Sequence, residues 1–172
     1  GLKLFETPKP IRLLREISKL TTDEDSIVLD FFAGSGTTAQ AVMELNAEDG
    51  GQRRFILVQI PQPIDAKKQK EAYQFVTETL GKADATIFEI TAERIRRAGK
   101  KILEEQKAKA EKEGNLFTEE EPNKLDTGFK VFKLDSSNIN AWDSDPDNLE
   151  TALNKSLFNI KEDRSEDDLL YE

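Results

Sequence analysis

The sequence predicts an α/β fold with a parallel sheet, and two observations support this. Two short apolar runs, 27–32 and 55–60, are typical of strands that are buried on both faces. Each run is followed by a segment with helical spacing of its apolar residues, 37–46 and 65–80. The order strand, helix, strand, helix is typical of parallel strands that are joined by right-handed crossovers.

Local signals place the elements around these strands. A helix is expected to begin near Pro10, because proline is tolerated in a first turn and one apolar face continues to Leu20. The first strand ends in a glycine turn, 33–38, which opens the next helix. Two prolines stop the second strand. Asp65 is then a suitable cap for a helix that ends just before Gly81.

The remaining elements are expected in the second half of the chain. Residues 85–90 are predicted to form a short third strand, with a lead-in to the next helix as the alternative. A long helix is predicted from Ala92 to Glu113 with Thr91 as its N-cap, and its second half, mostly charged, is expected to project into solvent. Alternating apolar and polar residues predict a strand at 128–134, and leucine spacing predicts a marginal helix at 149–157.

The charge is unevenly distributed along the chain. Residues 1–100 carry 15 basic and 15 acidic side chains, whereas residues 101–172 carry 10 and 19, which accounts for the whole net charge of −9. Because DNA binding by counterion release needs a basic face, the chain alone is predicted to bind DNA poorly. We expect a ligand-binding part at 1–113, a linker and β segment at 114–142, and an acidic, loosely ordered tail at 143–172.

The composition excludes several kinds of site. The chain has no cysteine and no histidine, so disulfides, thiolate metal sites and Ser-His-Asp catalysis are excluded, and no metal site is predicted. No apolar run approaches the ~18 residues that a membrane-spanning helix needs, and the first residues lack the pattern of a signal peptide. A cytoplasmic protein is the expected default.

The glycine turn after the first strand is the most informative stretch. Gly34 and Gly36 allow a sharp bend and a close approach to a ligand, and the amides at the start of the next helix favour a carboxylate or another polar group. Asp30, at the end of the strand, is a candidate acceptor for an amine. A phosphate-binding loop would need lysine after the last glycine, and a dinucleotide site would favour an acid where Gln59 stands, so both alternatives are weakened.

The same stretch resembles a known family. Asp30 to Thr38, DFFAGSGTT, resembles the cofactor motif of amino-group DNA methyltransferases that use S-adenosylmethionine, in the form typical of the modification subunits of type III restriction-modification systems. Four further stretches resemble blocks of that family in the same order: TPKPIRLL at 7–14, FILVQIP at 55–61, ERIRRAGKKI at 93–102 and DTGFKVFKLD at 126–135. The resemblance covers about residues 5–142.

This resemblance implies a Rossmann-like methyltransferase half-domain with a long projecting helix and a small β-containing acidic C-terminal region. The family's catalytic signature, Asp-Pro-Pro-Tyr, is absent, because no two of the six prolines are adjacent. In the permuted class that signature precedes the cofactor motif. The chain therefore looks like the C-terminal, cofactor-binding part of an adenine-specific methyltransferase in a bacterial cytoplasm, inactive alone and with no catalytic residue of its own.

The resemblance also implies partners and a set of site residues. Duplex DNA is expected to bind through the missing N-terminal part, a restriction subunit with helicase and nuclease activity is the expected partner, and a homodimer is allowed. The implied contacts to S-adenosylmethionine are Lys9, Asp30, Phe32, Ala33, Gly34, Ser35, Gly36, Thr37 and Gln59. Lys9 is alternatively a solvated lysine, and Phe32 alternatively belongs to the core.

Two alternatives to this function stay open. The chain is alternatively a subunit-contact fragment that binds no cofactor and acts through its long helix and acidic tail. A nicotinamide-dependent oxidoreductase is disfavoured by Gln59. The basic residues of the long helix, Arg94 among them, are either a DNA-backbone contact or an ordinary solvated helix face.

Overall fold

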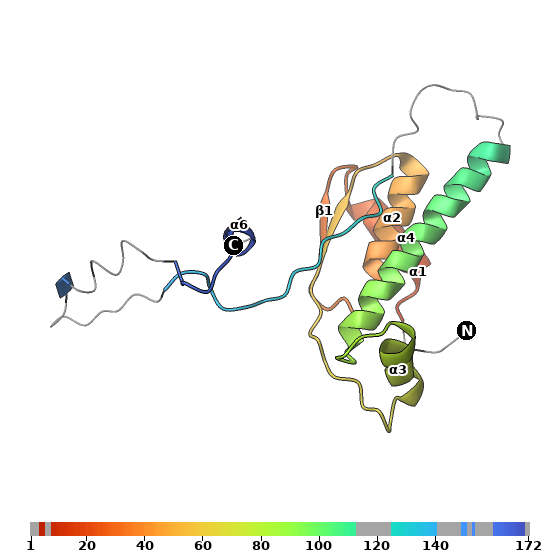
Figure 1. Ribbon diagram of the computed structural model, residues 1–172. Coiled ribbons are helices and arrows are strands. Elements are labelled where there is room, and N and C mark those ends of the chain that lie inside the picture. Colours follow the sequence, from red (N-terminus) through yellow and green to blue (C-terminus); the bar gives the residue numbers. More distant parts are fainter. Residues whose placement is uncertain are drawn as a thin grey trace. The chain divides into compact units, whose positions relative to one another are not determined.

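A computed structural model of the chain describes residues 4–5, 8–112, 125–140, 149–150, 153 and 160–170 (Figure 1). The chain divides into two compact units, Gly1–Phe129 and Lys130–Glu172. The three regions expected from composition remain a prediction.

The first unit contains a small parallel sheet. Strand β1 (Ile27–Asp30) pairs in parallel with β2 (Arg54–Leu57), and α2 (Thr37–Asp49) connects them. The predicted strand–helix–strand unit is therefore confirmed. In the part of the chain that the structure describes, the sheet has these two strands only, so a full Rossmann-like sheet remains a prediction.

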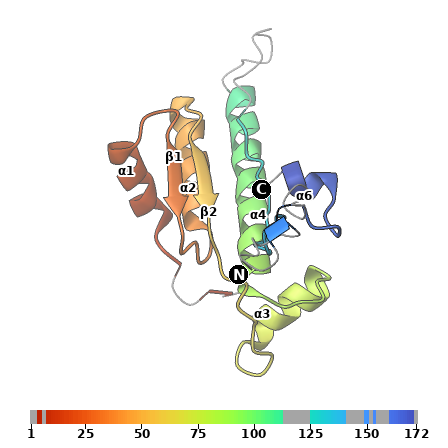
Figure 2. The same ribbon diagram turned by 90° about the vertical axis from the view of Figure 1, so that its left-hand side faces the viewer.

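A layer of helices covers one face of this sheet. The helices α1 (Ile11–Thr21) and α4 (Ile87–Lys112) pack on α2 from either side (Figure 2). As predicted, α1 begins directly after Pro10. Side chains from α2 and α4 form a core cluster against which two residues of β2 pack: Ala39, Met43, Ile95, Ala98 and Ile102, with Phe55 and Leu57.

The expectation that both strands are buried on two faces is wrong for the described residues. Exposure alternates along each strand, and the side chains that point away from α2 are about half exposed: Ile27 52%, Leu29 57% and Ile56 52%. The apolar stripe of α1 also lacks cover, since Leu13, Ile17 and Leu20 are exposed. We call these six residues the uncovered apolar set.

The predicted third strand at 85–90 is wrong. Thr86 makes an isolated antiparallel bridge with Pro63, and α4 begins at the next residue. Ile90 is buried in a second apolar cluster with Phe75 and Val76, which favours helical spacing over strand alternation. Thr91 is consequently an interior residue of α4 and not its N-cap.

The helix expected from Asp65 also begins later. Asp65 Oδ1 accepts the backbone N–H groups of Lys67 and Lys68 at 2.8 and 3.1 Å, and so caps a turn. The helix itself consists of α3 (Lys70–Gln74), followed by a π-helical turn, η1 (Phe75–Thr79). Together these elements form the lower lobe in Figure 1.

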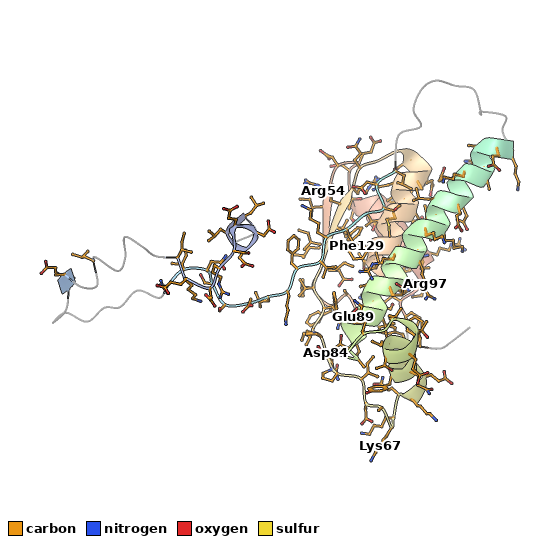
Figure 3. The ribbon with its side chains drawn as sticks, viewed as in Figure 1. Arg54, Lys67, Asp84, Glu89, Arg97 and Phe129 are labelled. Carbon is orange, nitrogen blue, oxygen red and sulfur yellow. The ribbon has the colours of Figure 1, made fainter. Side chains whose placement is uncertain are left out.

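The second half of α4 is exposed, as predicted, and carries pairs such as Lys101 with Glu105 at 3.5 Å. Where the chain is described again, Leu125 and Phe129 pack against the core cluster. The guanidinium of Arg96 lies 5.5 Å from the centre of the Phe129 ring, which Figure 3 shows beside α4. Residues 128–134 form no strand, so that prediction is wrong.

The second unit has little regular structure among its described residues. Ile139 forms an isolated bridge with Ile160, and a short helix, α6 (Glu166–Leu170), follows in the region expected to be loosely ordered. Of the helix predicted at 149–157, residues 149, 150 and 153 are helical, and the others lie outside the described residues.

Candidate cofactor-binding turn

The turn between β1 and α2 has the backbone that the two glycines predict. Gly34 and Gly36 both have positive φ, 54° and 72°, a region that glycine adopts without steric cost. The Ala33 N–H donates to Val58 O at 3.1 Å, which fixes the start of the turn beside the end of β2. The Gly36 N–H donates to Ala33 O at 2.8 Å and closes the turn.

Asp30 organises this turn from within. Its Oδ1 accepts the Phe32 N–H at 3.1 Å, and its Oδ2 accepts the Thr38 hydroxyl at 2.6 Å. Both carboxylate oxygens therefore have a donor inside the protein. The structure gives Asp30 the role of linking the end of β1 to the first turn of α2, which sequence reasoning did not anticipate.

Gln59 lies beside the turn, as expected for neighbouring parallel strands. Its Oε1 accepts the Gly34 N–H at 2.7 Å, and its Nε2 donates to Ile60 O at 3.0 Å. The structure thus brings Gln59 and the glycine turn together through a direct bond. Its side-chain oxygen is engaged by the turn in this arrangement.

The other predicted site residues fall into two groups. Ala33, Ser35 and Thr37 are buried, and the Ser35 and Thr37 hydroxyls are hydrogen-bonded to each other at 2.9 Å. Phe32 is exposed at the end of β1, where its ring centre lies 5.2 Å from that of Phe31. Lys9 is exposed ahead of α1, and within the described part of the chain no hydrogen bond or ion pair joins it to the turn.

Helix α4 supplies contacts that sequence reasoning missed. The Thr91 hydroxyl donates to Gly34 O at 2.5 Å and to Ile87 O at 3.0 Å. Arg94 donates to Ser35 O at 3.2 Å and to the Gln40 side chain at 2.7 Å. Thr91 and Arg94 are three residues apart, a spacing that puts two side chains on the same face of a helix. The sequence shows this spacing, but it predicts a shared face only if the helix begins before Thr91.

The Arg94 side chain consequently points toward the protein and is not part of a solvated helix face. Partial burial lowers the pKa of its guanidinium, and the charge of Glu44 acts in the opposite direction. Arg97, about one helical turn further along α4 (Figure 3), differs: its Nε donates to Glu93 at 2.6 Å, and its guanidinium lies over the Phe75 ring. Two of the Arg94 side-chain nitrogens are therefore engaged inside the protein.

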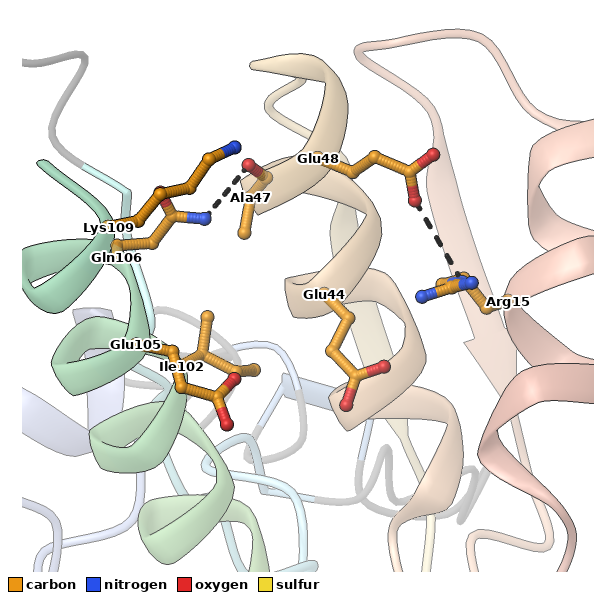
Figure 4. Close-up of a pocket in the computed structure, with 8 residues that line it drawn as sticks. All are labelled: Arg15, Glu44, Ala47, Glu48, Ile102, Glu105, Gln106 and Lys109. Carbon is orange, nitrogen blue, oxygen red and sulfur yellow. Dashed lines mark hydrogen bonds and ion pairs between the residues drawn. The ribbon is translucent and has the colours of Figure 1, made fainter. Parts of the chain in front are cut away.

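Two open hollows in the described part of the chain lie away from the turn. One, of about 400 Å³, lies between α1, α2 and α4 and is lined by side chains of both charges, which include Arg15, Glu44 and Lys109 (Figure 4). The other, of about 580 Å³, is lined by residues 22–25 with Asp49 and Arg53. Neither contains a predicted site residue, so the candidate site is the open surface of the turn.

The described residues offer neither a metal site nor a membrane-spanning helix. They include no group of three or more acidic side chains with the spacing of a metal site. None of the described helices is both long enough and apolar enough to cross a membrane.

Comparison with known proteins shows which family the turn resembles. Residues 1–64, which contain β1 and the whole glycine turn, match the family described as DNA methylase. The chain is 51% identical over 104 residues to the type III restriction-modification enzyme StyLTI Mod subunit of Salmonella typhimurium, a match that covers 59% of this chain and 14% of the relative. It is 50% identical over 101 residues to the EcoPI Mod subunit of Escherichia phage P1, covering 59% and 14%.

A third relative extends the match along the chain. The EcoP15I Mod subunit of Escherichia coli is 39% identical over 132 residues, which is 76% of this chain and 15% of that protein. The chain thus spans about one seventh of the length of these relatives. The predicted resemblance is confirmed: over residues 1–64 the chain is similar to the DNA methylase family, and over longer stretches it is similar to type III Mod subunits.

Proposed function

We propose that this chain is the S-adenosylmethionine-binding portion of a DNA methyltransferase that modifies the exocyclic amino group of adenine in a type III restriction-modification system. One observation carries the proposal. A turn with two left-handed glycines, Gly34 and Gly36, joins the end of a parallel strand to the start of α2, and it does so within the residues that match the DNA methylase family.

The residues around the turn fit such a ligand. A Cβ at Gly34 would meet only Phe32 O, at 3.8 Å, so space is open on that side of the backbone. The start of α2 has no side-chain cap, which leaves its positive end for the carboxylate of the methionine part. The exposed Phe32 ring offers an apolar face for the ligand. Lys9 is the proposed second contact to the carboxylate, and Gln59 orients the turn or reaches the ribose.

When bound, S-adenosylmethionine supplies an activated methyl group on its sulfonium. This chain's own residues bind and orient the cofactor. The base-binding signature Asp-Pro-Pro-Tyr has no counterpart in the sequence, and the net charge of −9 disfavours duplex binding by this chain alone. We therefore propose that methyl transfer and DNA contact need parts of the enzyme outside this chain, with a restriction subunit as the cleavage partner.

The uncovered apolar set supports the need for further polypeptide. Its six members lie on α1, β1 and β2, and exposed apolar surface of this kind favours contact with another protein surface. The same observation favours a second candidate function, a subunit-contact segment without cofactor binding. Measured affinity for the cofactor distinguishes the two.

Isothermal titration calorimetry of the full chain with S-adenosylmethionine tests the proposal, with NADH as the comparison ligand. Gly34→Ala and Gly81→Ala form a matched pair, because both glycines have positive φ, 54° and 64°, and neither Cβ would clash with a side chain. Saturable binding of S-adenosylmethionine alone, weakened about 5- to 150-fold by Gly34→Ala and unchanged by Gly81→Ala, is expected from a methyl group placed in the ligand's space. Absence of binding favours the subunit-contact function.

A second experiment tests whether methyl transfer needs parts of the enzyme outside this chain. Transfer of labelled methyl groups to duplex DNA is expected to be undetectable with this chain alone, since it carries no catalytic signature. Turnover above that of Gly34→Ala would show that the chain has a catalytic motif of another kind.

A further inference from the structure

The glycine turn is held on one side by three residues of α4. Thr91, Arg94 and Ile95 lie at positions i, i+3 and i+4, and so share a helix face. Thr91 and Ile95 are buried, at 3% and 4% exposure. They bring the helix against the turn although nearly sixty residues separate the two in sequence.

Each contact acts on a different part of the turn. Thr91 donates to Gly34 O at 2.5 Å, and Arg94 Nη1 donates to Ser35 O at 3.2 Å. Ile95 lies directly beside Gly36, because a Cβ there would be 2.8 Å from Ile95 Cγ1. The carbonyls of two successive peptide groups are thus directed at one helix.

The orientation of those carbonyls sets the orientation of the amides. No peptide bond in the described chain is cis, and in a trans peptide the N–H points opposite to the C=O. Because Gly34 O points at Thr91, the Ser35 N–H points away from α4. Among the described residues this N–H has no acceptor, whereas the Gly34 and Gly36 amides are bonded to Gln59 and Ala33.

We propose that Thr91 and Arg94 are positioning residues of the cofactor site: they hold the turn in its left-handed conformation and direct the Ser35 N–H to the ligand side. The ligand part of this statement rests on the proposed function, whereas the conformational part does not. A hydroxyl has one proton, and the 2.5 Å contact to Gly34 O is the shorter of its two. The Thr91 side chain therefore links the turn to α4.

Hydrogen exchange of the Gly34 and Gly36 amides in the full chain, measured by NMR, tests the conformational part. Thr91→Val is expected to accelerate exchange at these amides about 2- to 12-fold, the range of one neutral hydrogen bond, and Thr91→Ser to restore it. Thr77→Val is the matched control, since the Thr77 hydroxyl donates only to Tyr73 O, at 2.9 Å, away from the turn. Arg94→Met should likewise accelerate exchange of the Gly34 and Gly36 amides, and Arg97→Met is its matched control.

Titration of the same variants with S-adenosylmethionine tests the ligand part. Weaker binding by Thr91→Val and Arg94→Met, with Thr91→Ser, Thr77→Val and Arg97→Met close to the unsubstituted chain, supports the proposal. Two outcomes overturn it. If the Gly34 and Gly36 amides exchange no faster in Thr91→Val than in Thr77→Val, the Thr91 hydroxyl does not hold the turn. If the amides of β1 and β2 accelerate equally, the helix packing has loosened in general. If the turn loosens selectively but the unsubstituted chain binds no S-adenosylmethionine, the positioning of the turn stands and the proposed function fails.

Discussion

Gly36→Ala tests how tightly α4 packs against the turn. The new Cβ would lie 2.8 Å from Ile95 Cγ1 and 2.9 Å from Ile95 Cδ1, which is closer than carbon atoms tolerate, and 3.2 Å from Thr91 Cγ2, which is a tight contact. Overpacking of this kind costs about 1–3 kcal/mol, and an alanine at positive φ costs a further ~1–2 kcal/mol. We expect the free energy of unfolding to fall by about 2–5 kcal/mol.

Urea denaturation followed by circular dichroism measures this loss, and Gly81→Ala isolates the part that is backbone strain. Gly81 has φ of 64° and no atom within 4 Å of its Cβ position, so its replacement should cost only about 1–2 kcal/mol. The change in unfolded-state entropy is the same for both substitutions and cancels in the comparison. The expected difference of about 1–3 kcal/mol reports the contact with α4.

A double-mutant cycle with Ile95→Ala then tests the cause. Removing the Ile95 side chain creates the space that the new Cβ needs, so the double variant should be more stable than the sum of the single effects by about 1–3 kcal/mol. Equal stabilities of Gly36→Ala and Gly81→Ala, or a coupling energy of zero, would refute the packing argument. The bulkier Gly36→Val is consequently a poor probe of the cofactor alone, because it should disturb this contact as well.

Three further predictions concern single side chains. Arg53→Met should lower the free energy of unfolding by about 1.5–3 kcal/mol in urea titration, because the Arg53 side chain is 4% exposed and pairs with Asp49 at 2.9 Å. Gln59→Ala should accelerate exchange of the Gly34 N–H about 2- to 12-fold by NMR, since that amide loses its acceptor. The urea midpoint should fall less on acidification in Glu48→Gln than in the unsubstituted chain. The reason is that the hydrogen bond from Lys19 holds the pKa of Glu48 below its usual value. A lowered pKa contributes stability that is present above the unfolded pKa and lost as pH falls through the folded one.

Each of these predictions has a matched control in the chain. Gln59→Glu keeps the acceptor oxygen, so fast exchange in that variant would contradict the assigned role. Glu104→Gln removes an exposed carboxylate whose oxygen lies 3.9 Å from Lys100, and a pH profile equal to that of Glu48→Gln would contradict the argument from Lys19. Arg97→Met removes an arginine that is 60% exposed, and it should cost much less than Arg53→Met.

Local sequence signals determined the parts of this protein that depend on neighbours along the chain. Pro10 fixes the start of α1, because proline fits a first helical turn. The short apolar runs and the glycines between them predicted β1, the turn and α2, because left-handed backbone is cheap only for glycine. The position of Gln59 beside the turn followed from the register of adjacent parallel strands.

Contacts between distant segments decided the rest. Residues 87–90 have the composition of a strand, yet they are helical because Ile90 is buried against residues of α3 and η1. The sequence makes Asp30 a candidate ligand contact and leaves Arg94 open between a DNA contact and a solvated helix face, and the structure shows each bonded to the turn or to its surroundings. A side chain's partner depends on which elements pack together, and local pattern carries no information on that. The sequence therefore determined where the turn is, and only the tertiary structure decided that α4 holds it.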